Sequence, residues 1–211
     1  MRSSFLRFPP KGVLTANELL DASPRRRGEW CLDALVGRYV EITGGASSSA
    51  LTVARDMVLQ AQQQGGLVAW VGSRSAMFFP PDFASAGIDL KALLVVFVDD
   101  ANSASRVVDL LFRSSGFAVI VLDVENNRGF SLAVQTRFAG LAKEYHTVLM
   151  EITRMHRDRS SRSSLASLRM ETTREHVDGE FFRMEMHALK DKRFSPGWKH
   201  TESCYGPDGV C

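Results

Sequence analysis

The chain has 211 residues, of which 45% are hydrophobic and 24% charged, and its formal net charge is +2 at pH 7. This composition is typical of a soluble globular protein with one domain of ordinary size, and it excludes an intrinsically disordered chain. The apolar run Leu93–Val98 is strand-sized and no run is long enough to span a bilayer, so we expect no membrane segment. The first residues lack the apolar core of a signal peptide, which predicts a cytoplasmic location.

Residues 1–29 form a polar leader ahead of the core, which we expect to occupy residues 30–211 as one domain. Within the leader, the segment from Thr15 to Glu18 has the spacing of a capping box and predicts one short helix. Arg25, Arg26 and Arg27 follow in a Pro/Gly-bounded stretch. They form either a solvated loop or a patch that contacts phosphate or a protein partner.

The middle of the chain alternates between short apolar runs and stretches of helical period. Strands are predicted at Tyr39–Thr43, Leu67–Val71, Leu93–Val98, Phe117–Leu122 and Thr147–Ile152. Between them, three apolar stripes predict amphipathic helices: Ala50, Ala54, Met57, Val58 and Ala61; Val107, Val108, Leu110 and Leu111; and Val134, Phe138, Leu141 and Tyr145. Such alternation predicts an α/β fold, with a mostly parallel sheet that is flanked by helices on both faces.

The pattern changes after residue 153. The segment Arg154–Ser164 is polar and rich in arginine, and it predicts a loop. Leu165–Arg174 and Phe181–Leu189 then alternate between apolar and polar residues around an Asp178-Gly179 turn, with a last short strand near Lys199–Tyr205. We therefore expect an antiparallel C-terminal hairpin extension with one solvated face.

Cysteine and histidine spacing gives no sign of a metal site. Cys31, Cys204 and Cys211 form no C-x-x-C pair, so reduced thiols without a catalytic role are expected. The five histidines are dispersed without ligand spacing. We expect neither a metal nor another cofactor.

A small-residue loop joins the first predicted strand to the first predicted helix, which is the position of a phosphate-binding P-loop. A working loop of this kind, G-x-x-x-x-G-K-[ST], uses glycines for close backbone approach, lysine to neutralise charge and a hydroxyl to bind Mg²⁺. Here Gly44 and Gly45 open the loop and Ser47 and Ser48 continue it. Ser49 stands at the second glycine position, Ala50 at the lysine position and Leu51 at the hydroxyl position.

Loss of the lysine and the hydroxyl removes the main electrostatic contributions to phosphoryl transfer. The sequence therefore predicts a protein that is not an enzyme and that keeps only a degenerate remnant of the loop. The serines and the helix N-terminus retain the ability to attract an anion, which is the alternative interpretation of this segment.

The order of motifs resembles the RecA family core over nearly all of residues 30–210. Trp30–Gly37 is similar to the family's L-D-x-L-L-G entry, and Tyr39–Thr52 to its V-E-I-x-G-P-E-S-S-G-K-T-T loop. Gly65–Arg74 resembles the strand that ends in a catalytic glutamate in the family, with Arg74 at about that place. Phe117–Asp123 resembles the Walker-B strand, with Asp123 as its acidic end, and the late segments resemble the family's last strands and Y-G-x-G close.

The departures from the family indicate a shortened and catalytically inactive core of the ImuA and SulA type, with ImuA the closer resemblance. An ImuA-like role implies a non-enzymatic accessory protein of damage-induced mutagenesis, which supports translesion synthesis through contacts with an ImuB-like polymerase homologue and with RecA, and which restrains RecA. The alternatives are a SulA-like inhibitor of cell division and a DNA-stimulated ATPase with an unorthodox P-loop.

Two further groups have competing interpretations. Asp99-Asp100 follows an apolar strand. The two carboxylates either hold a metal, act as acid and base, or cap the next helix, and the capping interpretation is favoured because Asn102-Ser103 comes next. The arginines Arg154, Arg157, Arg159 and Arg162 lie where the family meets DNA. They either contact DNA or an acidic partner, weakly and without base readout, or form a solvated loop.

Overall fold

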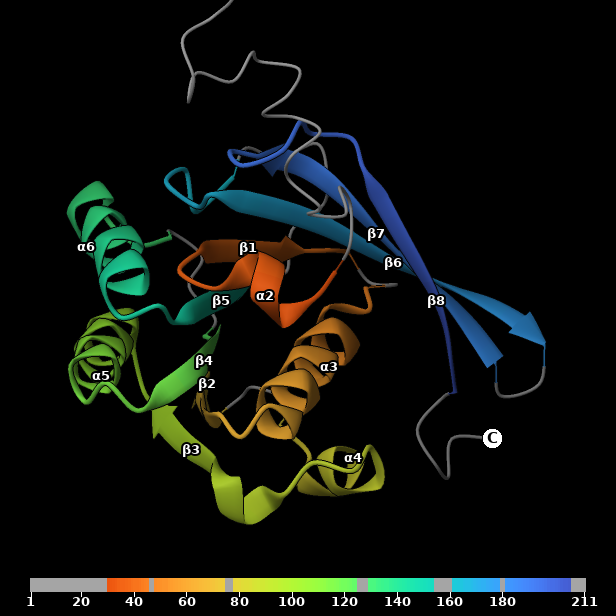
Figure 1. Ribbon diagram of the computed structural model, residues 1–211, viewed down its shortest axis with the longest axis horizontal. Helices are drawn as coiled ribbons and strands as arrows, with labels where there is room; N and C mark the ends of the chain where they lie inside the picture. The colour runs from red at the N-terminus through yellow and green to blue at the C-terminus, as the bar shows by residue number, and fades with distance from the viewer. Residues whose placement is uncertain are drawn as a thin grey trace, which may run out of the picture.

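The computed structural model describes residues 30–45, 48–74, 78–124, 129–153, 161–178 and 181–205. In this part of the chain the strands form one eight-stranded sheet with the order β3-β2-β4-β5-β1-β6-β7-β8 (Figure 1). They are β1 (Tyr39–Thr43), β2 (Leu67–Ser73), β3 (Leu93–Val98), β4 (Phe117–Asp123), β5 (Val148–Thr153), β6 (Leu168–Asp178), β7 (Phe181–Asp191) and β8 (Lys199–Tyr205). The strands from β3 to β6 in this order are parallel, and β7 and β8 are antiparallel. The predicted fold class is confirmed.

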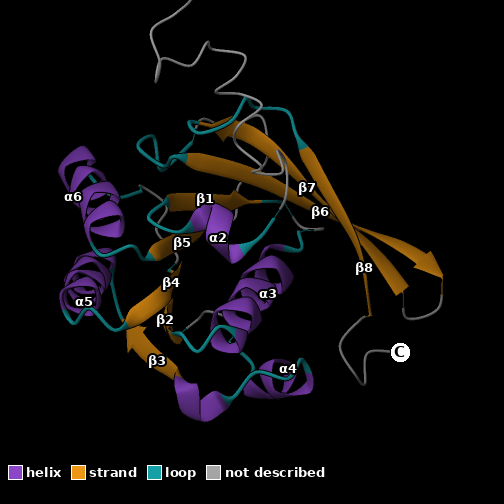
Figure 2. Ribbon diagram, viewed as in Figure 1, coloured by secondary structure: helices purple, strands orange, loops and turns teal. Residues whose placement is uncertain are grey.

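Helices cover both faces of the parallel part of the sheet. They are α2 (Leu32–Leu35), α3 (Ala50–Gln63), α4 (Pro80–Ser85), α5 (Ala101–Arg113) and α6 (Leu132–Glu144), with a 3-10 turn at Leu90–Ala92. Figure 2 shows α5 and α6 on one face and α3 and α4 on the other. Two apolar cores result, and β2 supplies both, because Trp70 packs on the α3 side and Val71 on the α5 side. Strands that are buried on both faces need continuous apolar sequence, as predicted.

The helical stripes are confirmed for α3 and corrected for α5. All five predicted stripe residues of α3 are buried. In α5 the buried residues are Ala104, Val108, Leu111 and Phe112, whereas Leu110 is 67% exposed. At about 100° per residue, Leu110 lies about 200° around the helix from Val108 and therefore faces solvent. In α5 the helical period therefore predicts which side chains are buried better than the presence of consecutive apolar residues does.

The antiparallel hairpin of β6 and β7 has the predicted buried face. Met184, Met186 and Ala188 of β7 are buried as the alternation indicated. On β6, however, the solvated face that was expected at Arg169 is covered, and this side chain is only 10% exposed. Arg169 lies on β6 beside β1, where its guanidinium Nε is 3.5 Å from a carboxylate oxygen of Glu41.

A buried ion pair joins the parallel core to the antiparallel extension. Arg38, just before β1, donates to the carboxylate of Asp191 at the end of β7 over 2.7 Å. The same guanidinium donates to the carbonyl and the hydroxyl of Ser167, just before β6. One side chain thus ties together the beginnings of β1 and β6 and the end of β7.

Several sequence predictions concern residues outside the described part of the chain. They are the leader helix, Arg25, Arg26, Arg27, Ser47, Arg154, Arg157, Arg159, Cys211 and the segment from Gly206 to Gly209.

Candidate functional site

The loop between β1 and α3 is fastened to β6 by two serine hydroxyls. Ser48 Oγ lies 3.0 Å from Thr172 Oγ1, and Ser49 Oγ donates to the carbonyl oxygen of Thr173 at 3.2 Å. Ser48 Oγ also accepts the N–H of Ala50, the first residue of α3, at 3.0 Å. A phosphate at a helix N-terminus would need such N–H groups. In this loop a serine of the chain itself already uses one of them.

Ala50 and Leu51, which stand where a working P-loop has its lysine and its hydroxyl residue, pack toward the protein interior. Ala50 is 6% exposed, and Leu51 packs against the apolar core on the α3 side. Gly44, at the end of β1, is closely surrounded, because a Cβ there would lie 2.3 Å from Ser48 Oγ and 2.8 Å from the Thr172 carbonyl oxygen. Gly44 is therefore packed closely against Ser48.

Asp123 is the last residue of β4 and lies beside Gly72 of β2. Its side chain is buried, with an exposed fraction of 3%. This position is the carboxyl edge of the parallel sheet, where α/β domains bind their ligands. That Asp123 is a Walker-B-like residue stays a prediction from the family resemblance.

The two acidic residues after β3 have separate structural tasks. Asp100 caps α5, because its carboxylate accepts the Ser103 N–H at 2.7 Å, and this hydrogen bond lowers the pKa of Asp100. Asp99 is exposed and lies 3.5 Å from the guanidinium Nε of Arg74 at the end of β2. The capping interpretation is confirmed for Asp100.

Sequence analysis missed a pair of buried glutamates on neighbouring strands. Glu41 of β1 and Glu151 of β5 stand at paired positions in the parallel ladder and are 0% and 5% exposed. The Tyr39 hydroxyl and the Ser163 hydroxyl both donate to Glu151. Burial raises the pKa of Glu151 to about 7, and the charge of Glu41 raises it too, against the opposing effect of these hydrogen bonds. Burial and the neighbouring Glu151 also raise the pKa of Tyr39 above its ordinary value.

Glu41 holds the segment that begins at Ser161, after the arginine-rich loop that follows β5. Glu41 accepts the Ser161 hydroxyl and, at 3.2 Å, the backbone N–H of Arg162. The guanidinium of Arg169, on β6, forms an ion pair with the Glu41 carboxylate. On the other side, the amide of Gln135 in α6 donates to the Arg162 carbonyl oxygen at 2.9 Å. The segment is thereby fixed between the sheet and α6.

Arg162 is the one member of the predicted arginine patch that lies in the described part of the chain. Its backbone is held by Glu41 and Gln135, and its positive charge lowers the pKa of Glu151. The structure therefore places Arg162 next to the buried glutamates, at the carboxyl edge of β1 and β5.

A sequence signal for the glutamate pair was present. The triplet Glu-Ile-Thr occurs twice, at residues 41–43 and 151–153, each time inside an apolar strand. A charged residue in a strand that is buried on both faces must find partners in the interior. Two such strands with the same triplet indicate that the glutamates share one environment.

Among the residues that the structure describes, no three His, Cys, Asp or Glu side chains come together to form a group able to hold a metal ion. None of their helices has both the length and the apolar character of a membrane span.

The features above define an α/β domain with a small-residue loop between its first strand and α3, and with a buried acidic residue at the end of β4. Residues 33–148 match the RecA N-terminal domain, and the chain belongs to this family.

Two RecA proteins share one segment with this chain. Protein RecA of a Nocardioides species is 42% identical over 88 residues, which are 41% of this chain and 25% of that protein. Protein RecA of a Nostoc species is 40% identical over 88 residues, 24% of its length. The matched segment thus spans about a quarter of these curated relatives. The crystal structure of the RadB recombinase has the same fold, with a TM-score of 0.62 at 18% identity, over 81% of this chain and 91% of that one.

Proposed function

We propose that this chain is a non-enzymatic accessory member of the RecA family, of the ImuA type, which acts through protein contacts in damage-induced mutagenesis. Its partners in this proposal are RecA, which it restrains, and an ImuB-like polymerase homologue. Weak, sequence-independent DNA contact by Arg154, Arg157, Arg159 and Arg162 belongs to the same proposal.

The observation that carries the proposal is that the degenerate phosphate loop is closed at Ser48 by hydrogen bonds within the chain. Ser48 accepts the Ala50 N–H and bonds to Thr172, so a phosphate would have to displace bonds that the chain makes to itself. With alanine at the position of the lysine, the loop offers a phosphate no positively charged side chain in return. This supports a role that does not depend on phosphoryl transfer.

The surface of the domain supports a role in protein contacts. Exposed apolar side chains lie on β3 and its flanks, among them Leu94, Phe97 and Leu90 at 44%, 48% and 41% exposure. Clustered apolar residues on the surface are typical of protein-binding sites. The family relationship supports RecA as a partner because RecA-type cores assemble with one another.

The test is binding between the purified full-length chain and its two proposed partners from the same genome. We expect saturable binding of RecA or of the ImuB-like polymerase homologue, with the same affinity in the presence and absence of ATP. An unrelated ATPase of similar size and charge is the control. Failure to bind either partner would contradict the proposal, and capture of a purified cell-division filament protein instead would favour the SulA-like alternative.

A further inference from the structure

Gln135 is a buried glutamine on the inner face of α6. Only 4% of it is exposed, and the other buried residues of this helix are Phe138, Leu141 and Ala142, all apolar. A side-chain amide carries two N–H donors and an oxygen that accepts two hydrogen bonds, and burial is costly unless these groups find partners. A glutamine on an otherwise apolar helix face therefore indicates a specific hydrogen-bonding task.

The Gln135 amide joins two segments that are distant in sequence. Its Nε2 donates to the Phe130 carbonyl oxygen at 2.7 Å and to the Arg162 carbonyl oxygen at 2.9 Å. Its Oε1 accepts the Leu165 N–H at 3.1 Å and the Ser164 hydroxyl at 3.2 Å. All four hydrogen-bonding positions of the amide are used, and they connect the chain just before α6 with the chain just before β6.

The backbone of Arg162 is held from three sides. Gln135 donates to its carbonyl oxygen, and Glu41 of β1 accepts its N–H at 3.2 Å. Gly129 lies against the same carbonyl, because a Cβ at Gly129 would be 3.0 Å from the Arg162 oxygen, and the φ of +71° there favours glycine. The main chain of Arg162 is therefore fixed, whereas the residue as a whole is only partly buried.

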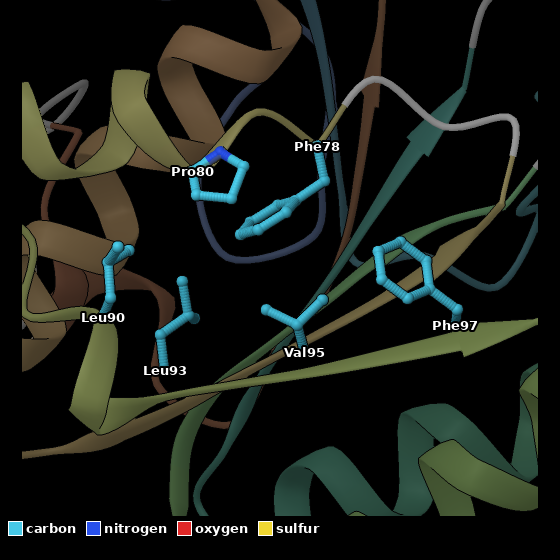
Figure 3. Close-up of a pocket in the computed structure, with 6 residues that line it drawn as sticks. All are labelled: Phe78, Pro80, Leu90, Leu93, Val95 and Phe97. Atoms are coloured by element: carbon cyan, nitrogen blue, oxygen red, sulfur yellow. The ribbon is translucent and has the colours of Figure 1, made fainter.

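The apolar groove beside β3 has no comparable group for an anion. Its volume is about 390 Å³, and the six side chains that line it are all apolar, as Figure 3 shows: Phe78, Pro80, Leu90, Leu93, Val95 and Phe97. Phosphate groups are bound by guanidinium, ammonium and N–H donors. Arg162 supplies such a donor beside β1, which four strands of the sheet order separate from the β3 edge.

We propose that Gln135 is a positioning residue for nucleic-acid contact, which holds the Arg162 backbone so that the guanidinium meets a phosphate of single-stranded DNA. This inference rests on the DNA contact in the proposed function. A fixed backbone reduces the conformational entropy that is lost when a long side chain binds a ligand. Since Gln135 is buried, its effect on DNA binding should pass through Arg162 alone.

The first test measures binding of a single-stranded thymidine oligonucleotide to the full-length chain over a series of salt concentrations, by fluorescence anisotropy. Arg162→Ala should reduce the slope of log affinity against log salt by about 0.7, the value of one phosphate contact on a single strand. Gln135→Leu should reduce the slope by the same amount. Gln63→Leu, the same substitution at an exposed position of α3, should leave it unchanged.

A double variant separates positioning from a general structural role. If Gln135 acts through Arg162, Gln135→Leu should have no further effect on affinity in a chain that already carries Arg162→Ala. Equal weakening in both backgrounds would show a general structural role and would overturn the proposal. Gly129→Ala places a Cβ against the Arg162 carbonyl and leaves the amide unchanged, so it should reduce the slope as Gln135→Leu does.

Amide hydrogen exchange tests the anchoring without DNA. Gln135→Leu should speed exchange at the Arg162 N–H about tenfold, because this N–H bonds to Glu41 and is protected only while the segment stays in place. Unchanged exchange there would overturn the proposal.

The outcomes distinguish this inference from the proposed function. If the parent chain binds no DNA at low salt, the DNA contact of the proposed function fails, and the role of Gln135 fails with it. If the parent binds DNA but Gln135→Leu keeps the full slope, only the positioning role fails. If Arg162→Ala weakens binding to RecA and not to DNA, Arg162 contacts a protein, and the proposal is likewise overturned.

Discussion

Replacing Asp191 with asparagine is expected to reduce the free energy of unfolding by about 3 to 5 kcal/mol, because the Arg38 guanidinium would stay buried without its counter-charge. Arg38 and Asp191 have side chains that are 2% and 0% exposed. Asp191 also accepts the Arg193 N–H at 2.8 Å and the indole N–H of Trp198 at 3.0 Å. Burial raises the pKa of Asp191, but these bonds and the bond from Arg38 outweigh it and hold the pKa below its ordinary value.

The measurement is urea unfolding of the parent chain and of Asp191→Asn at neutral pH. Glu185→Gln is the matched control, because Glu185 pairs with Lys199 at 2.8 Å on the surface, where an ion pair contributes about 1 kcal/mol or less. If Asp191→Asn costs no more than the control, the Arg38–Asp191 pair does not hold the core and the extension together.

The second large effect is a pH dependence that originates at Glu151. Its pKa is raised from 4.5 to about 7 in the fold, so the folded state binds a proton that the unfolded state has lost. The corresponding stability is fully present below about pH 4.5 and is lost as the pH rises to about 7, a decrease of about 3 kcal/mol. Glu151→Gln cannot titrate, and its unfolding free energy should lack this decrease.

Urea unfolding of the parent and of Glu151→Gln between about pH 4.5 and about pH 8 tests this expectation. The difference between the two curves isolates Glu151, because the remaining titratable groups are common to both chains. Glu144→Gln, which removes an exposed carboxylate at the end of α6, should keep the parent's pH dependence. Parallel curves for the parent and Glu151→Gln would show that Glu151 is ionised throughout.

Local periodicity predicted the fold because each strand and helix has its own signal. The apolar run at Leu93–Val98 and the stripe of α3 are readable from neighbouring residues alone, and both were confirmed. The error at Leu110 has the same origin, since an apolar residue next to a buried stripe need not belong to it. The order of the strands in the sheet has no such local signal.

The site was predictable only in part. The place of the degenerate phosphate loop follows from the small residues between a strand and a helix, whereas its closure by Ser48 depends on Thr172, which is 124 residues away. Glu41 and Glu151 are likewise separated by more than a hundred residues, and they meet only because β1 lies between β5 and β6. Contacts of this kind require the strand order, which the sequence pattern did not supply.

The most direct test of the central claim, that this RecA-family core works without nucleotide, is calorimetric titration of the purified full-length chain with ATP and Mg²⁺. A phosphate-release assay with and without single-stranded DNA accompanies it, and purified RecA serves as the positive control. The closed loop predicts no saturable heat and no phosphate release above buffer. Saturable, Mg²⁺-dependent binding together with turnover would contradict it and favour a DNA-stimulated ATPase.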